Sequence, residues 1–344
     1  MTASSGAASP AAFRAFLTTQ TDGQFAAAVR ELGPGDLPAG PVLVRVGYSA
    51  MNYKDALVCT NNGKIAQACP LVPGLELTGE VVESSDPAFR VGDRVISLDF
   101  GQRLGISQHG GYSAYARVPG DAIVALPAEL GYREALVLSG GVAALMAIRE
   151  LEHAGLTPAR GPVLVTGATG GVGSLAIALL ARRGYTVAAS TGKPDAESYL
   201  RQLGASEILS RAETSAESTR PLEAERWAGS LDSVGGATLA YLMRTTKKAG
   251  AIAAIGVAGG PAFHSTVFPL ILRGIKLLGI DMPSTPLPAR GQWWAQIQEE
   301  TGVLDLAASI IHEVALDDVP GAAKAMLRGQ TRGRTLVRVA EPGA

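Results

Sequence analysis

The chain has 344 residues, of which 47% are hydrophobic and 18% are charged, and its formal net charge is -1 at pH 7. This length is typical of about two domains, and the apolar content is sufficient for two cores. The chain has no Lys/Arg-rich run, which argues against a nucleic-acid-binding protein. Its two cysteines, Cys59 and Cys69, are too few for a disulfide framework or a four-thiolate zinc site, and they fit a reducing compartment.

The first third of the chain combines short strand patterns with turns. Residues 1–12 are rich in Ala and Ser and lack a basic start followed by an apolar core, so we predict a disordered tail there and not a signal peptide. Several short strands within about a hundred residues favour a small β-barrel or sandwich. The expected strands are Val42–Tyr48, Gly79–Val82, Arg94–Ser97 and Ser113–Val118.

The pattern changes near Tyr132. A helical pattern from Glu134 to Glu150, interrupted at Ser139-Gly140-Gly141, precedes a regular alternation of strands and helices, which predicts a parallel sheet covered on both faces. We expect strands at 163–166, 186–190, 206–209, 229–234, 251–256 and 275–280, and helices at 174–183, 195–203 and 237–247.

The end of the chain reads as one helix, Pro320–Arg328, and one strand, Arg334–Val339, which we expect to return to the first domain. The uncharged stretch Ala249–Leu272 is broken by Gly259-Gly260-Pro261, so we predict no membrane helix and expect a soluble, cytoplasmic protein.

A glycine-rich turn carries the strongest functional signal. Residues 163–173 read Val-Leu-Val-Thr-Gly-Ala-Thr-Gly-Gly-Val-Gly and lead from a strand into a helix. In this setting a dinucleotide pyrophosphate rests on the N–H groups of the helix N-terminus, whereas the alternative is a tight turn without a ligand. Glycines here leave no Cβ between a phosphate and the backbone and let the helix approach the strand. The candidate cofactor-binding residues are Thr169, Gly170, Gly171, Val172 and Gly173.

The residues after the second strand of this region indicate which dinucleotide binds. An NAD site usually has Asp or Glu there, to bond the ribose 2′-OH, but this chain has hydroxyl and basic side chains instead. The sequence therefore predicts NADPH, with Asp195 and Glu197 keeping NADH as an alternative. The candidates for the 2′-phosphate are Ser190, Thr191, Lys193 and Arg211, although the two cations are alternatively ordinary surface charges.

Motifs along residues 13–340 add a family resemblance. They are Asn52-Tyr53-Lys54-Asp55-Ala56-Leu57, Pro73-Gly74-Leu75-Glu76, Arg220-Pro221-Leu222-Glu223, Trp227-Ala228-Gly229, Asp232-Ser233-Val234-Gly235, Gly256-Val257-Ala258-Gly259-Gly260 and Pro269-Leu270-Ile271-Leu272-Arg273. In this order they resemble the zinc-free, quinone-oxidoreductase-like branch of the medium-chain dehydrogenase/reductase superfamily. The resemblance implies a mixed α/β and β fold: a GroES-like barrel domain (13–133 and 281–344) and a Rossmann domain with a doubly wound parallel sheet that binds NADPH (134–280).

The resemblance also implies a reaction. Zinc-dependent relatives have Cys at the position of Asn52 and His at the position of Leu75, so we expect no metal. The implied activity is reduction of an activated C=C bond, with hydride going from NADPH to the β-carbon of a 2-enoyl thioester such as acrylyl-CoA. The alternatives are an NADPH-dependent quinone or enone reductase and a non-catalytic NADPH-binding protein.

The catalytic candidates from the resemblance are Tyr53, Asn52 and Lys54. Tyr53 is expected to lie against the cofactor, where its hydroxyl could orient the carboxamide or donate a proton, or else to pack in the barrel. Asn52 could instead hold the loop, together with Asp55. Lys54 could stabilise an enolate or contact a substrate phosphate, or be solvated.

The resemblance places four further residues and one strand. His109 and Arg290 are expected to border the substrate, with Arg290 able to pair with phosphate, although a structural role is the alternative for His109. Val257 and Ile271 are expected to line the cofactor. The edge strand Lys276–Ile280 resembles one that pairs across a two-fold axis, so a homodimer is expected.

Overall fold

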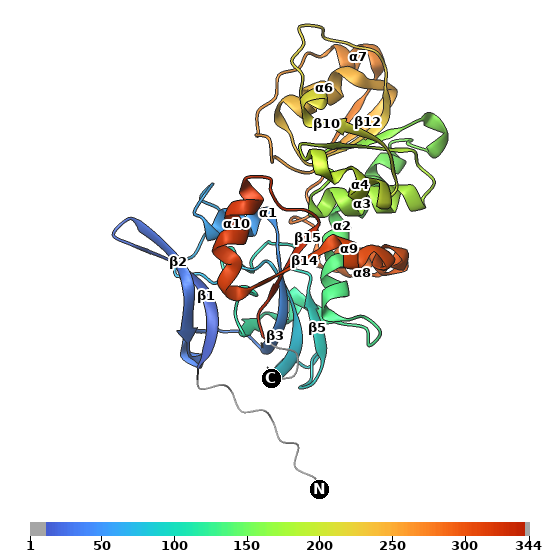
Figure 1. The fold of residues 1–344 in the computed structure, drawn as a ribbon. Helices are drawn as coiled ribbons and strands as arrows, with labels where there is room; N and C mark the ends of the chain where they lie inside the picture. The colour runs from blue at the N-terminus through green and yellow to red at the C-terminus, as the bar shows by residue number, and fades with distance from the viewer. Residues whose placement is uncertain (1–11, 341–344) are drawn as a thin grey trace. The chain divides into compact units, whose positions relative to one another are not determined.

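The computed structural model describes residues 12–340, which form two compact units (Figure 1). The first unit comprises the chain up to Ser139, residues 283–294 and the chain from Ile311 onward, and the second comprises residues 140–282 and 295–310. Residues 295–310 thus group with the second unit, whereas the sequence analysis assigned them to the first domain. Except for Ala12, the predicted tail lies outside the described residues. Helices α2 (Tyr132–His153) and α8 (Leu287–Glu299) run through the boundaries between the units.

The first unit is built on a seven-stranded sheet with the order β14-β15-β3-β4-β5-β7, in which β6 also pairs with β3. The last strand pairs antiparallel with β3, with Leu336 opposite Ala50, so the predicted return of the chain end to the first domain is confirmed. The strands are β3 (Val42–Met51), β4 (Glu76–Ser84), β5 (Arg94–Ser97), β6 (Tyr115–Val118), β7 (Ile123–Ala125), β14 (Ile311–Ala315) and β15 (Arg334–Arg338).

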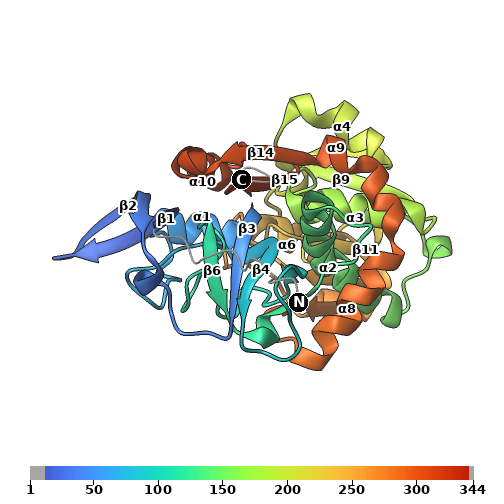
Figure 2. The ribbon, with the colours of Figure 1, turned by 90° about the horizontal axis from the view of Figure 1, so that it is seen from below.

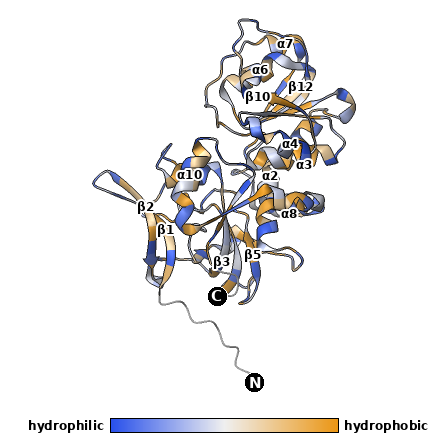
Figure 3. Ribbon diagram, in the orientation of Figure 1, coloured by the Kyte–Doolittle hydropathy of each residue, from blue (hydrophilic) through white to orange (hydrophobic). Residues whose placement is uncertain are grey.

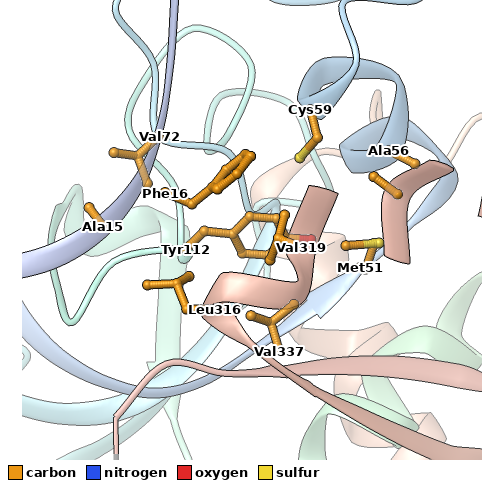
Figure 4. Close-up of a cluster of buried hydrophobic side chains, with 11 residues drawn as sticks. Ala15, Phe16, Met51, Ala56, Cys59, Val72, Tyr112, Leu316, Val319 and Val337 are labelled. Atoms are coloured by element: carbon orange, nitrogen blue, oxygen red, sulfur yellow. The ribbon is translucent and has the colours of Figure 1, made fainter. Parts of the chain in front are cut away.

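A separate hairpin of β1 (Phe13–Thr21) and β2 (Gln24–Leu32) precedes this sheet and was not predicted (Figure 2). Its two-residue turn, Asp22-Gly23, has φ of 50° and 78°, as a twisted hairpin turn requires. Phe16 of the hairpin packs into an apolar cluster with α1 (Tyr53–Cys59) and α10 (Val319–Leu327) around the ring of Tyr112 (Figure 4). This cluster fixes α1 within the first unit.

The second unit contains a six-stranded parallel sheet with the order β10-β9-β8-β11-β12-β13. Counted along the chain from β8, this is the order 3-2-1-4-5-6 of a doubly wound sheet, which confirms the predicted fold class. The strand order reverses between β8 and β11, where ligands bind such sheets. The strands are β8 (Val163–Val165), β9 (Val187–Thr191), β10 (Ala205–Ser210), β11 (Trp227–Asp232), β12 (Thr246–Ala254) and β13 (Lys276–Gly279).

The remaining helices are α3 (Gly171–Arg182), α4 (Glu197–Gln202), α5 (Arg211–Thr214), α6 (Gly236–Thr245), α7 (Phe268–Arg273) and α9 (Ala307–Ile310). Two expectations for helices were wrong. Helix α2 continues through Ser139-Gly140-Gly141, because these residues are buried and tertiary packing overrides the weak helix propensity of glycine. Helix α3 begins at Gly171 and not at Ser174, so the glycine turn itself forms the first helical turn. Strands of the parallel sheet near the labels β10 and β12 are orange in Figure 3, because many of their residues are apolar.

Within residues 12–340 no helix is both long enough and apolar enough to cross a membrane.

Candidate active site

The N-terminus of α1 is held by a buried polar network in the first unit. Asn52 precedes the helix with extended backbone, and its N–H donates to Oδ2 of Asp55 at 2.8 Å. The Asn52 side-chain amide donates to Asp55 Oδ2 at 3.2 Å and to Glu76 Oε1 at 3.1 Å. Its carbonyl oxygen accepts a hydrogen bond from Arg334. Every hydrogen-bonding atom of the Asn52 side chain is therefore engaged.

Arg334 connects this network to the last strand of the chain. Its guanidinium donates to Glu76, to Asn52 and to the carbonyl oxygen of Leu136 at 3.1 Å. The side chains of Arg334 and Glu76 are only 4% and 8% exposed, so this is a buried ion pair. Such a pair is retained only when its geometry and its remaining hydrogen bonds offset the desolvation of both charges.

Asp55 is the second carboxylate of the network and is fully buried. Besides the two donors of Asn52, its Oδ1 accepts from the N–H groups of Gly74 at 3.1 Å and Leu75 at 2.9 Å. Burial, and to a smaller extent the charge of Glu76, raise the pKa of Asp55 to about 7, although the N–H donors of Asn52 and Leu75 act in the opposite direction. Asp55 thus ties the start of α1 to the backbone of residues 74 and 75.

Tyr53 and Lys54 are the first two residues of α1 and directly follow Asn52, which belongs to this network. Tyr53 is the first residue of α1 and is 37% exposed, and within the described residues its hydroxyl has no hydrogen-bond partner. Lys54 is half-buried. The arrangement gives Asn52 a positioning role and leaves the Tyr53 hydroxyl available to a bound molecule.

The two residues expected to border the substrate are engaged within the first unit. The guanidinium of Arg290 is 3% exposed and donates to the carbonyl oxygens of Thr285 at 2.9 Å and Leu98 at 3.3 Å, and to the Gln102 side chain at 2.7 Å. This geometry favours a role in anchoring the segment around Leu98 over a phosphate contact.

His109 is half-buried, and its Nδ1 accepts from the N–H of Val72 at 3.4 Å. Burial lowers the pKa of His109, so the ring is neutral at pH 7 and carries no charge for an anionic substrate.

In the second unit the glycine-rich turn has the geometry of an anion cradle. Gly167 has φ of 58°, and Gly170 precedes the first turn of α3. A Cβ on Gly173 would lie 2.5 Å from the carbonyl oxygen of Gly167 and 2.9 Å from Cα of Ala168. Only glycine therefore fits at position 173, and the close approach directs the N–H groups of the first turn of α3 toward the carboxyl edge of the sheet.

Basic side chains flank this cradle. Lys193 extends from the residues after β9 so that its Nζ lies 2.8 Å from Oγ1 of Thr169. Arg211 lies across Gly192, where a Cβ would be 3.1 Å from its Cζ. Thr191 accepts from the N–H of Lys193 at 3.1 Å. Lys193 thus lies beside the glycine turn and Arg211 lies beside Gly192, just after β9, whose last residues carry no carboxylate.

The other predicted cofactor residues differ in how accessible they are. The hydroxyl of Ser190 is buried and shares a 2.5 Å hydrogen bond with Thr214, so it is less available than predicted. Val257 and Ile271 are 53% and 66% exposed and lie on the segment after β12 and on α7.

Comparisons with known proteins agree with this architecture. The alcohol dehydrogenase GroES-like domain model matches residues 38–128, and the zinc-binding dehydrogenase model matches residues 171–301. The acrylyl-CoA reductase AcuI of Ruegeria pomeroyi is 44% identical over 93% of this chain and 96% of its own. The chain belongs to the medium-chain dehydrogenase/reductase family. Its relatives place it in the quinone-oxidoreductase-like branch.

Two solved structures from this branch of the medium-chain dehydrogenase/reductase family resemble the chain over nearly its full length. The yhdH oxidoreductase of Salmonella enterica, solved in complex with NADP, is 43% identical over 95% of this chain and all of its own, with a TM-score of 0.88. The yhfP protein of Bacillus subtilis, solved with NAD bound, is 41% identical over 95% of this chain and 99% of its own, with a TM-score of 0.86.

The donor set of this family member does not fit zinc. Asn52 presents an amide and Leu75 an alkyl side chain, and neither is a ligand that zinc prefers. The described part of the chain contains no group of three or more His, Cys, Asp or Glu residues that could hold a metal. The positive charge that pairs with Glu76 is the guanidinium of Arg334.

Sequence reasoning missed Glu76 and Arg334 as parts of this site. A signal was present, because both are charged residues within apolar strand patterns, Leu75-Glu76-Leu77 and Arg334-Thr335-Leu336. A charged residue in a buried strand requires a partner. Their pairing could not be deduced, since they are separated by 258 positions in the sequence.

Proposed function

We propose that this chain is an NADPH-dependent reductase that delivers hydride to the β-carbon of a 2-enoyl thioester such as acrylyl-CoA. The observation that carries the proposal is the 44% identity, over nearly the whole chain, to a protein named acrylyl-CoA reductase. The exposed Tyr53 hydroxyl beside a rigid network supports it, since a protein that only binds the cofactor needs no such group.

The cradle fits a phosphorylated dinucleotide. The N–H groups of Gly171, Val172 and Gly173 bind its pyrophosphate, and Lys193 and Arg211 neutralise a 2′-phosphate. When bound, NADPH supplies a hydride from its nicotinamide ring.

The polar groups of the first unit complete the reaction. Tyr53 orients the reactants or donates a proton through its hydroxyl. Lys54 stabilises negative charge on the substrate oxygen as the C=C bond is reduced. Arg334, Glu76 and Asn52 keep both side chains in place.

A second candidate is reduction of small quinones or enones. It is favoured by Arg290 and His109, because the first has its guanidinium engaged and the second is neutral. Neither then offers a charge to a thioester's phosphates.

We further propose a homodimer. The described residues include nine exposed large hydrophobic side chains, and all but Tyr53 and Val91 lie between Val257 and Leu277. This surface includes α7 and the edge strand β13, whose free backbone groups can pair with a second copy. The unpaired cysteines, one buried and one exposed, fit a cytoplasmic protein.

The test is NADPH oxidation with acryloyl-CoA and, in parallel, with a small quinone. Faster turnover of the thioester is expected, and turnover of the quinone alone would refute the thioester assignment. For the cofactor, the Lys193→Ala/Arg211→Ala variant should lose at least about tenfold in its preference for NADPH over NADH. Arg201→Ala, which removes an exposed arginine of α4, is the control and should leave that preference unchanged.

A further inference from the structure

A buried carboxylate at the carboxyl end of β11 takes no part in the proposed reaction. Asp232 is fully buried. Its carboxylate accepts hydrogen bonds from the hydroxyl of Thr166 at 2.5 Å and from the N–H groups of Val234 at 3.1 Å and Gly235 at 2.9 Å. Within the described part of the chain these neutral donors, and no cation, compensate its charge. A buried carboxylate without a cation is costly, so its place at the edge where ligands bind such a sheet indicates a role beyond stability.

Asp232 connects the segments that follow three neighbouring strands. Thr166 directly follows β8 and leads into the glycine-rich turn, and its hydroxyl also accepts from the N–H of Ser233 at 3.2 Å. The backbone carbonyl oxygen of Asp232 accepts from the N–H groups of Ile255 at 2.8 Å and Gly256 at 3.2 Å, just after β12. Because β8, β11 and β12 are parallel, these contacts join the segments after all three strands at one edge of the sheet.

The segments after β11 and β12 pack backbone against backbone. The N–H of Gly259 donates to the carbonyl oxygen of Val234 at 2.7 Å, and a Cβ on Gly256 would lie 2.5 Å from the carbonyl oxygen of Ser233. The apolar side chain of Val257 stands on this surface and is 53% exposed. We call this surface the platform; it comprises residues 233–236 and 255–260.

The strand order indicates which half of a dinucleotide the platform serves. A doubly wound sheet binds a dinucleotide across its two halves, with the pyrophosphate at the glycine-rich turn between them. Lys193 and Arg211, which we propose for the 2′-phosphate of the adenosine half, follow β9 and β10. The platform follows β11 and β12, in the other half of the sheet. The nicotinamide half of NADPH therefore belongs on the platform side, where Val257 offers an apolar contact.

We propose that Asp232 is a positioning residue for the nicotinamide half of NADPH. Through the Thr166 hydroxyl, its carboxylate holds the platform in register with the glycine-rich turn, so that both halves of the cofactor fit at once. The proposal rests on the proposed function only for the cofactor, and it does not depend on which substrate is reduced.

The glycine-rich turn keeps its shape through bonds of its own. The N–H of Ala168 donates to the carbonyl oxygen of Ser190 at 3.1 Å, and the N–H of Gly170 donates to that of Gly167 at 2.9 Å. Loss of the Thr166 hydroxyl should therefore loosen the platform and spare the turn. Binding of the nicotinamide half should then weaken more than binding of the rest of the cofactor.

The test compares Thr166→Val, which removes the hydroxyl, with Thr166→Ser, which retains it. Titration calorimetry measures the dissociation constants of NADPH and of 2′-phospho-ADP-ribose, a fragment that lacks the nicotinamide. The wild type should bind NADPH more tightly than the fragment. In Thr166→Val this advantage of NADPH should fall at least about threefold, whereas in Thr166→Ser it should remain. Asp232→Asn should lower it as well, because the amide nitrogen of asparagine cannot accept a hydrogen bond.

Thr246→Val is the matched control. Thr246 is also fully buried, but it begins β12 at the opposite edge of the sheet, and its hydroxyl donates to the carbonyl oxygen of Leu242 at 2.7 Å. This variant should keep the wild-type advantage of NADPH, and urea unfolding compares the stability that the two valine variants lose. An equal fall of the advantage in both valine variants would indicate general loosening of the unit and overturn the proposal.

Binding separates this proposal from the proposed function. The expected fall in Thr166→Val, in a protein that reduces neither acryloyl-CoA nor a quinone, would support the positioning role and refute the reductase assignment. An unchanged advantage of NADPH in Thr166→Val would overturn the positioning role even if acryloyl-CoA is reduced.

Discussion

Replacing Arg334 with methionine tests whether the buried network holds the candidate active site together. The substitution keeps an unbranched side chain but removes the donors to Glu76, Asn52 and the carbonyl oxygen of Leu136. Glu76 then remains buried as a carboxylate whose remaining contact is the Asn52 amide at 3.1 Å. Removing one partner of a buried ion pair costs about 3–5 kcal/mol.

The same strand offers a matched control. Arg338 pairs with Glu313 at 3.1 Å, but these side chains are 38% and 29% exposed. An exposed pair contributes at most about 1 kcal/mol, so Arg338→Met should cost far less than Arg334→Met. Urea unfolding of the wild type and both variants measures the difference in the free energy of unfolding.

A second substitution separates the two parts of the effect. Adding Glu76→Gln to Arg334→Met removes the unpaired charge, so part of the lost stability should return. The kcat for an enoyl thioester should stay at least about tenfold below the wild-type value in both Arg334 variants, because Asn52 loses the guanidinium bonded to its side-chain oxygen and holds the start of α1 less firmly. If Arg334→Met lost no more stability than Arg338→Met, the reasoning from burial would be wrong.

Three further predictions concern other groups. Tyr53→Phe removes a hydroxyl that has no hydrogen-bond partner within the described residues. The free energy of unfolding should therefore change by less than about 0.5 kcal/mol, while kcat should fall at least about tenfold. Full activity of this variant would exclude a catalytic role for the hydroxyl. Burial raises the pKa of Asp55 from 3.8 to about 7, so the folded protein holds a proton over this pH range that the unfolded chain has released. The stability that Asp55 contributes through this proton should be complete below about pH 4 and be lost as the pH rises through about 7. Urea unfolding of the wild type and Asp55→Asn at pH 5 and pH 8 measures it, and equal pH dependence in both would show that the N–H donors keep the carboxylate ionised. Leu277→Lys places a charge on the exposed face of β13 and should yield monomers in sedimentation experiments, whereas an unchanged dimer would place the interface elsewhere.

The sequence predicted the second unit better than the first. Its strands are short apolar runs separated by helices, so local pattern alone identifies them, and the glycine turn marks the start of the first strand–helix unit. The β1–β2 hairpin escaped prediction because β2 faces solvent along much of its length and lacks a clear alternation. Helix α1 has seven residues, too few for a periodic pattern to stand out.

The candidate site was predicted where its residues are close in the sequence. Lys193 was expected near the phosphates from its position after the second strand; its Nζ lies 2.8 Å from Oγ1 of Thr169, and its role in binding phosphate stays a prediction. The roles of Arg290 and Asn52 were harder to predict, because each depends on acceptors far away in the chain. Arg290 bonds residues near Leu98, and Asn52 bonds Arg334, 282 positions later.

The ion pair between Arg334 and Glu76 explains how the buried charge at the start of α1 is balanced without a metal. Glu76 is buried beside the start of α1, and its negative charge has to be balanced there, whereas burial raises the pKa of Asp55 to about 7 and so favours its neutral form. A divalent cation could balance it, but it would also demand ligands that Asn52 and Leu75 do not provide. Arg334 supplies a fixed positive charge and, unlike a metal, donates in three directions at once. The last strand therefore contributes to the candidate active site, because its Arg334 bonds Asn52, the residue that directly precedes Tyr53 and α1.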